Sequence, residues 1–235
     1  WLAQVLVAQG RRPGIISRGY GSAQSAPRPV TAESTPATVG DEPILLQRRS
    51  GVPVWVGRDR AEAGAALLAQ HPEVDVLIAD DGLQHYRLAR DAEIVVFDRR
   101  AVGNGWRLPL GPLREPLSRL RQVTAVVCNG EVDGIAWPPT LPRFHMQLLP
   151  GRWVCLGQPD AEFDPATLNR RPLHAVAGIG HPDRFFATLR DLGLQVIEHP
   201  FPDHHAFTAA DLDFGPDAIL LMTEKDAVKC AGLVS

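Results

Sequence analysis

The sequence predicts an α/β protein with a doubly wound, mostly parallel sheet and a second, smaller α/β domain. Short apolar runs alternate with amphipathic stretches along the chain, which is typical of strands alternating with helices. The 235 residues are sufficient for one large α/β domain or for two unequal ones. An apolar share of 45% and a charged share of 22% are ordinary for a globular protein.

The first half of the chain supplies most of the expected sheet. Residues 1–9 have a helical periodicity that ends at Gly10, and residues 59–71 form an amphipathic helix with an acidic first turn. A polar loop rich in Ser, Ala, Pro and Thr is expected at about 22–39. Further helices are expected at 43–50 and 116–121. Strands are expected at 13–17, 52–56, 74–79, 92–97 and 123–128. This alternation favours a parallel sheet.

The composition changes at 134–172, where prolines are frequent. Two apolar stretches there, 143–149 and 153–156, are expected to pair as a hairpin that bridges two domains. The smaller α/β unit then follows, with its helix expected at 182–192 and strands at 173–177, 194–198 and 218–222. Thr208 and Asp211 fit a capping box.

These patterns divide the chain into three parts. We expect a core domain over 1–140, a β linker over 141–172, and a smaller C-terminal domain over 173–235 that is incomplete at its end. The chain opens at Trp1 inside a helical pattern, so we expect that residues precede it in the natural protein.

Composition excludes several classes of function. The net charge of −3 gives no broad basic surface, so nucleic acid is not expected as a partner. The three cysteines form no C-x-x-C pair, which argues against a disulfide framework or a zinc knuckle and favours a reducing cytoplasm. No apolar stretch approaches the ~20 residues of a transmembrane helix, and no signal peptide is recognisable.

Two adjacent carboxylates, Asp80 and Asp81, follow the strand expected at 74–79. Ligands of open parallel sheets bind beyond the carboxyl ends of the strands, so these side chains are expected to face a ligand crevice. A carboxylate at this point typically holds Mg²⁺ in nucleotide-binding proteins. An ordinary Asp-Asp-Gly turn is the alternative, and the pattern alone leaves both open.

Two further motifs carry polar groups near strand or helix ends. In G-D-E-P, Asp41 and Glu42 come just before the helix expected at 43–50, where capping of that helix is the favoured interpretation. In S-R-G-Y-G, Arg18 follows a strand and has the fork geometry that suits a phosphate. An ordinary glycine turn explains this second motif equally well.

A long loop, G-N-G-W-R-L-P-L-G-P-L-R-E-P, occupies Gly103–Pro116. Long loops without secondary structure are often functional. Its arginines, Arg107 and Arg114, could neutralise the charge of a phosphate, and Glu115 could be a metal ligand.

Three segments of the C-terminal part are less decisive. H-P-F-P-D-H-H at His199–His205 is rich in metal ligands, but its spacing fits no common zinc pattern, and an Asp-His pair suits proton transfer. G-I-G at 178–180 favours tight packing over phosphate binding. T-E-K-D at Thr223–Asp226 fits either a helix cap or an interdomain contact.

Taken in order, these motifs resemble the tetraacyldisaccharide 4'-kinase family of lipid A biosynthesis. The resemblance rests on S-R-G-Y-G, V-G-D-E-P, D-D-G-L-Q-H, G-N-G-W-R-L-P-L-G-P-L-R-E-P, A-G-I-G-H-P-D-R-F-F, F-P-D-H-H and M-T-E-K-D-A-V-K. It implies a P-loop-NTPase-like core. It also implies phosphorylation of the 4'-hydroxyl of a tetraacylated glucosamine disaccharide 1-phosphate by Mg²⁺-ATP, at the cytoplasmic face of the bacterial inner membrane.

The resemblance also implies roles for individual residues. Asp41 would be the catalytic base and His204 its partner, with His205 as the alternative histidine of the same motif. The implied magnesium ligands are Asp80, Asp81 and Glu115; the implied nucleotide contacts are Gln84, His85 and Arg114; the implied substrate contacts are Arg18, Tyr20 and Asn104. Leu83 stands where the family usually has an aromatic residue.

One departure from the family is large. The family's phosphate-binding loop carries a G-K-[ST] motif, and this chain has no lysine before Lys225. We therefore expect a fragment without its P-loop and membrane-associating segment, inactive alone. Two alternatives stay open: a metal-dependent hydrolase that uses the Asp and His clusters, and a non-catalytic module that binds nucleotide or lipid.

Overall fold

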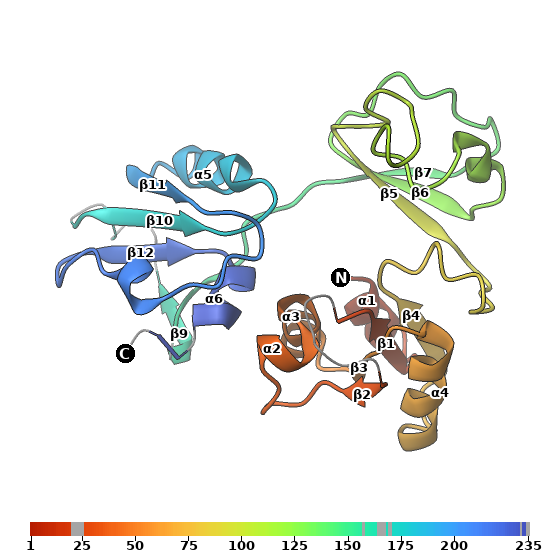
Figure 1. Ribbon diagram of the computed structural model, residues 1–235, viewed down its shortest axis with the longest axis horizontal. Coiled ribbons are helices and arrows are strands. Elements are labelled where there is room, and N and C mark those ends of the chain that lie inside the picture. The colour runs from red at the N-terminus through yellow and green to blue at the C-terminus, as the bar shows by residue number, and fades with distance from the viewer. Residues whose placement is uncertain (20–25, 157, 164–167, 169–170, 231, 234–235) are drawn as a thin grey trace. The chain divides into compact units, whose positions relative to one another are not determined.

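The protein is described here by a computed structural model covering residues 1–19, 26–156, 158–163, 168, 171–230 and 232–233 (Figure 1). Its chain divides into two compact units. The first unit joins Trp1–Gly82 with Gly151–Ser235, and the second is Leu83–Pro150. The domain boundaries expected near 140 and 172 stay a prediction. Within the described ranges, no helix has both the length and the apolar character needed to cross a membrane.

The N-terminal part of the first unit is a small sheet covered by helices. Its elements are α1 (Leu2–Ala8), β1 (Pro13–Ser17), β2 (Arg28–Pro29), α2 (Pro36–Val39), α3 (Asp41–Ser50), β3 (Val54–Val56), α4 (Arg60–Gln70) and β4 (Val76–Ala79). The strand order is β2-β3-β1-β4, in which β1 pairs in parallel with β3 and β4, and β2 is antiparallel to β3. The expected strands and helices of this part are confirmed.

The stretch expected as a polar loop at 22–39 contains two short elements, β2 and α2. Thr35 and Thr38 form a capping box, and Pro36 occupies the first turn of α2, where its missing N–H is not needed. Polar and proline-rich composition therefore concealed one turn of helix. Residues 20–25 lie outside the described part of the chain.

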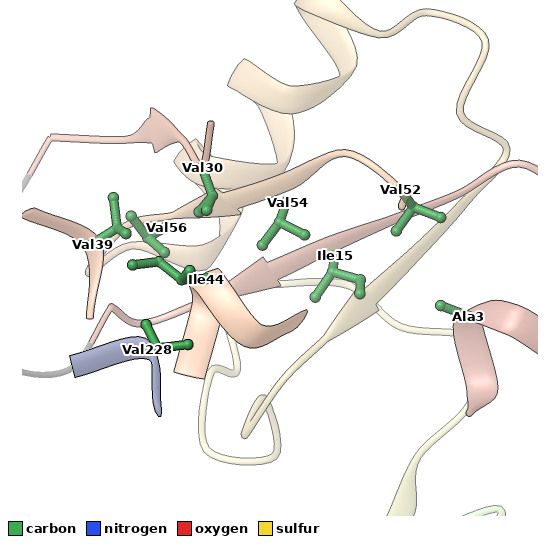
Figure 2. Close-up of a cluster of buried hydrophobic side chains, with 9 residues drawn as sticks. All are labelled: Ala3, Ile15, Val30, Val39, Ile44, Val52, Val54, Val56 and Val228. Carbon is green, nitrogen blue, oxygen red and sulfur yellow. The ribbon is translucent and has the colours of Figure 1, made fainter. Parts of the chain in front are cut away.

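A cluster of buried aliphatic side chains holds this part together (Figure 2). Its members are Ala3, Ile15, Val30, Val39, Ile44, Val52, Val54, Val56 and Val228. Each fully buried Val or Ile contributes about 1.5–3 kcal/mol by leaving water. Val228 belongs to α6 (Glu224–Cys230), near the other end of the chain. The C-terminal helix is thus part of the same core as α3.

The C-terminal part of the first unit has a parallel sheet in the order β11-β10-β12. Its elements are β8 (Trp153–Cys155), β9 (Gln158–Phe163), β10 (Leu173–Ala177), α5 (Pro182–Asp191), β11 (Val196–Pro200), the 3₁₀ helix η3 (Ala209–Leu212), β12 (Ile219–Met222) and α6. The predicted capping box is confirmed, since Thr208 caps η3 and Asp211 bonds back to it.

The second unit contains a separate three-stranded parallel sheet in the order β5-β6-β7. Its elements are β5 (Ile94–Asp98), the 3₁₀ helix η1 (Leu117–Arg121), β6 (Ala125–Asn129) and β7 (Arg143–Met146). The expectation that β5 and β6 continue the sheet of β1, β3 and β4 is not met. Residues 80–93 contain turns but no helix, and a parallel crossover within one sheet usually needs a helix.

The hairpin expected from 143–149 and 153–156 is wrong. β7 pairs in parallel with β6, and β8 pairs antiparallel with β9. The connection at 130–142 is long enough for the crossover that a parallel pair requires, whereas Pro150 lies between the two stretches that were expected to pair.

The three cysteines differ in accessibility, which gives a simple test of the packing. Cys155 is exposed, whereas Cys128 and Cys230 are buried. Burial, together with the charge of Asp226, raises the pKa of Cys230 to about 11, so little of it is thiolate at pH 8. We expect iodoacetamide to label Cys155 first in the native protein, and the others only after unfolding. Peptide mass spectrometry identifies the labelled residue, and early labelling of Cys230 would contradict this packing.

Candidate active site

Asp41 is a buried carboxylate at the start of a helix. It is 6% exposed and is the first residue of α3, directly after Gly40. The positive end of the helix dipole stabilises a negative charge at this position. Gly40 is the N-cap, and no side chain makes a cap hydrogen bond, so the capping role favoured for Asp41 is wrong. Its Oδ1 accepts a hydrogen bond from the Glu42 N–H at 3.0 Å. Its buried Oδ2 accepts none from the described residues.

His204 is the histidine that lies next to Asp41. Its Nδ1 is 3.4 Å from Asp41 Oδ2, longer than a usual hydrogen bond. The backbone N–H of His204 donates to the Gly178 carbonyl at 3.2 Å and to Asp203 Oδ1 at 3.0 Å. Its φ of 59° is rare for a residue with a side chain. Such strained positions occur often at functional sites.

His205 has a different environment. Its Nε2 lies 3.3 Å from Asp211 Oδ2, and its ring packs against Phe201 and Phe207 with centroid distances of 4.7 and 4.9 Å. These contacts are those of a packing residue. Of the two histidines that the sequence left open, the geometry brings His204 to Asp41.

The Asp80-Asp81 pair follows β4 directly, as expected. Asp80 Oδ2 accepts a hydrogen bond from the buried Ser17 hydroxyl at 2.9 Å. Burial raises the pKa of Asp80, and the charges of Glu42 and Asp81 raise it further, while the Ser17 hydrogen bond acts in the opposite direction. Asp81 is exposed and has a φ of 48°. The strand end therefore concentrates negative charge, which a cation would offset.

Arg60 is a buried residue that donates a hydrogen bond to the backbone of this strand end, and it was not identified from the sequence. The side chain is 1% exposed, and it donates to the Gly57 carbonyl at 2.7 Å and to the Asp80 carbonyl at 3.4 Å. Burial lowers the pKa of Arg60, and the charges of Asp80 and Asp81 partly compensate. An arginine in the first turn of a helix gives no sequence signal for such a role, because most arginines there are exposed.

The donors at this strand end fit a magnesium ion better than zinc. Carboxylate and hydroxyl oxygens from Asp80, Asp81 and Ser17 are the hard ligands that Mg²⁺ prefers. The histidines of the 199–205 segment make separate contacts: His199 Nε2 lies 2.9 Å from His174 Nδ1, His204 lies beside Asp41, and His205 lies beside Asp211. Across the described ranges, no group of three or more His, Cys, Asp or Glu side chains is placed to hold a metal, and Mg²⁺ is commonly bound through only one or two carboxylates together with substrate phosphates.

In the second unit, the structure brings two of the predicted residues together. Gln84 Nε2 donates to Glu115 Oε1 at 3.5 Å, and the Tyr86 hydroxyl also donates to Glu115. The hydrogen bond to Glu115 raises the pKa of Tyr86. Sequence reasoning missed Tyr86, which directly follows the D-D-G-L-Q-H motif. His85 is half-buried in the same segment, and Arg114 is exposed beside Glu115.

Asn104 and Arg18 were expected at the substrate. Asn104 makes hydrogen bonds within the loop Gly103–Pro116. Its Nδ2 donates to the Leu110 carbonyl at 2.9 Å, and its Oδ1 accepts from the Trp106 N–H at 3.1 Å. Arg18 is exposed at the end of β1, and its positive charge helps to lower the pKa of Arg60. Tyr20 lies outside the described residues.

Comparisons with known proteins point to one family. The family model for tetraacyldisaccharide-1-P 4'-kinase matches residues 1–235. A tetraacyldisaccharide 4'-kinase of Dechloromonas aromatica is 59% identical over 236 residues, which cover 100% of this chain and 71% of that protein. One of Azoarcus sp. is 50% identical, over 98% of this chain and 68% of that protein.

A solved structure is also similar. It is a crystal structure of LpxK from Aquifex aeolicus in complex with ATP, with a TM-score of 0.77 and 30% sequence identity. The match covers 98% of this chain and 74% of that chain. The predicted fold class is confirmed by this likeness, and a structure with ATP supports the prediction of a nucleotide site.

The sequence similarity extends over the whole chain. The hydrolase and the non-catalytic module are not favoured, and the predictions of a kinase, of ATP binding and of a role in lipid A biosynthesis are confirmed. By its match to the family model from the first residue to the last, the chain belongs to the tetraacyldisaccharide-1-P 4'-kinase family.

Proposed function

We propose that the protein carrying this chain transfers the γ-phosphoryl group of Mg²⁺-ATP to the 4'-hydroxyl of a tetraacylated glucosamine disaccharide 1-phosphate, with Asp41 as the general base. One observation is the main support for Asp41 as the base. Asp41 Oδ2 is buried, accepts no hydrogen bond from the described residues, and lies 3.4 Å from His204 Nδ1. This oxygen is free to accept a substrate proton.

The reaction requires little covalent chemistry from the protein. As the 4'-oxygen bonds to phosphorus and the bond to the ADP oxygen breaks, the hydroxyl proton passes to Asp41 Oδ2. His204 orients the carboxylate through Nδ1 and shares the proton that it receives, which is the role of the second member of an acid-base pair. The low exposure of Asp41 keeps water from competing for its oxygen.

The cation and the nucleotide are assigned to the acidic strand end and to the second unit. Asp80 and Asp81, together with Glu115, would hold Mg²⁺, which supplies charge neutralisation on the phosphates when it is bound. Ser17 and Arg60 hold Asp80 in place. The nucleotide contacts proposed are Gln84, His85 and Arg114. The substrate contacts proposed are Arg18, Tyr20 and Asn104.

We also propose that the enzyme works at the cytoplasmic face of the bacterial inner membrane, because its acceptor is a lipid. Membrane association through a segment outside these residues is part of the same proposal. The net charge of −3 gives no reason to expect nucleic acid as a partner.

The test is phosphoryl transfer by the full-length natural protein that contains this chain. The acceptor is the tetraacyldisaccharide 1-phosphate in detergent, and the donor is ATP labelled in its γ-phosphate. We expect label on the 4'-oxygen, loss of transfer when EDTA removes divalent cations, and recovery when Mg²⁺ is restored. An acceptor blocked at its 4'-hydroxyl is the control and should stay unlabelled. Label at another position, or transfer that persists in EDTA, contradicts the proposal.

A further inference from the structure

The T-E-K-D motif is the conspicuous polar cluster that the proposed mechanism does not use. It lies at the start of α6, and its lysine connects two other motifs. Lys225 Nζ is 3.0 Å from Glu42 Oε1 and 3.6 Å from Asp203 Oδ1. Glu42 directly follows Asp41, and Asp203 directly precedes His204. One ammonium group thus contacts the chain neighbours of both members of the Asp41–His204 pair.

The charges around this lysine explain why a cation is needed there. The carboxylates of Asp41, Glu42 and Asp203 come from two segments of the chain and would repel one another. Burial lowers the pKa of Lys225, but the hydrogen bond to Glu42 and the charges of Asp41 and Asp203 outweigh it, so the pKa is raised. Because its pKa is raised, the Lys225 ammonium group stays charged at neutral pH. Its side chain is 18% exposed and is thus partly shielded from water.

The helix that carries Lys225 is held firmly against α3. Val228 lies in the same buried cluster as Val39 and Ile44 (Figure 2). At the surface, Arg49 Nη1 donates to both carboxylate oxygens of Glu224 at 2.8 Å. Because this packing fixes α6, the Lys225 side chain starts from a defined position, and the exposed Arg49–Glu224 ion pair adds little to it.

The same helix also holds the segment that presents His204. The buried Asp226 Oδ2 accepts the Gly178 N–H at 3.2 Å, and the Gly178 carbonyl accepts the His204 N–H at 3.2 Å. A Cβ on Gly178 would lie 3.2 Å from Asp226 Oδ1 and 3.0 Å from the Phe207 ring, which explains the tight packing expected for G-I-G. The segments that carry Asp41 and His204 therefore both contact α6.

We propose that Lys225 is a positioning residue for phosphoryl transfer: by bridging Glu42 and Asp203, its ammonium group fixes the separation of Asp41 and His204. This inference rests on the proposed function. Lys225 acts through its two carboxylate partners and contacts neither reacting atom. The expected effect is therefore on the chemical step, since a shift of about 1 Å in a reacting group costs about 10²-fold in rate.

The test compares Lys225→Met with Lys225→Arg and with a matched control, Arg49→Met, in the full-length natural protein. We expect Lys225→Met to lower kcat by about 10²-fold and to leave the KM values for ATP and lipid nearly unchanged. Lys225→Arg keeps the charge and should recover most of kcat. Arg49→Met removes an exposed ion pair between α3 and α6, and should keep kcat near that of the unmodified protein.

A double variant separates positioning from simple loss of stability. If Lys225 acts through Glu42, then Lys225→Met combined with Glu42→Gln should lose no more activity than the worse single variant. Independent, additive losses would overturn the proposal. A rise in KM alone, or a loss no larger than that of Arg49→Met, would overturn it as well. Absence of transfer by the unmodified protein would instead contradict the proposed function.

Discussion

Replacing Asp41 with Asn is expected to lower kcat for lipid phosphorylation by about 10²–10⁴-fold, the usual contribution of a general base. The amide keeps the shape of the side chain but accepts a proton far less readily than the carboxylate. The Asn oxygen can still accept the Glu42 N–H hydrogen bond that Asp41 accepts at 3.0 Å, so the start of α3 should be retained. Steady-state kinetics at saturating ATP and lipid measures the loss.

Controls for this variant separate chemistry from folding and binding. Asp213→Asn changes an exposed carboxylate whose oxygen accepts the Gly215 N–H, and it should leave kcat unchanged. Unfolding midpoints and ATP affinity should match in the two variants. If Asp41→Asn retains kcat within about threefold, a different group accepts the proton, and the role given to Asp41 is wrong.

The strands and helices were predictable because their signals are local. Apolar runs gave β1, β3 and β4, and the amphipathic pattern after Asp59 gave α4, whose start is capped by that side chain. The separation of β5–β7 into their own sheet was not predicted. Strand pairing depends on the crossover between strands, and alternation of elements alone does not reveal which strands are joined.

The site shows the same division between local and tertiary information. An acidic residue at a helix start is most often a cap, so the local pattern favoured capping for Asp41, whereas the N-cap in the structure is Gly40. Only the family resemblance paired it with His204, because the two residues are far apart in the sequence. Arg60, Tyr86 and Lys225 were missed or left open for a similar reason: each acts through partners that come together only in the folded chain.

Replacing Asp226 with Ala is expected to lower the free energy of unfolding by about 3–5 kcal/mol, the range for breaking a buried ion pair. Asp226 is 0% exposed, and its Oδ1 lies 2.7 Å from Lys229 Nζ. Its Oδ2 accepts from the Gly178 N–H and from the Thr223 hydroxyl at 2.8 Å. Alanine leaves these donors without an acceptor, and equilibrium urea unfolding measures the loss.

The size of this loss depends mainly on the charge left behind. The Lys229 side chain is 9% exposed and packs over the Phe207 ring, so without Asp226 its ammonium group remains poorly solvated. Adding Lys229→Met to Asp226→Ala should therefore recover part of the lost stability. If the double variant is less stable than Asp226→Ala, the charge of Lys229 is not the cause. The Gly178 carbonyl accepts hydrogen bonds from both Lys229 and the His204 N–H. If the double variant regains stability but loses activity, the segment around Gly178 that holds His204 must be rigid for catalysis as well as for folding.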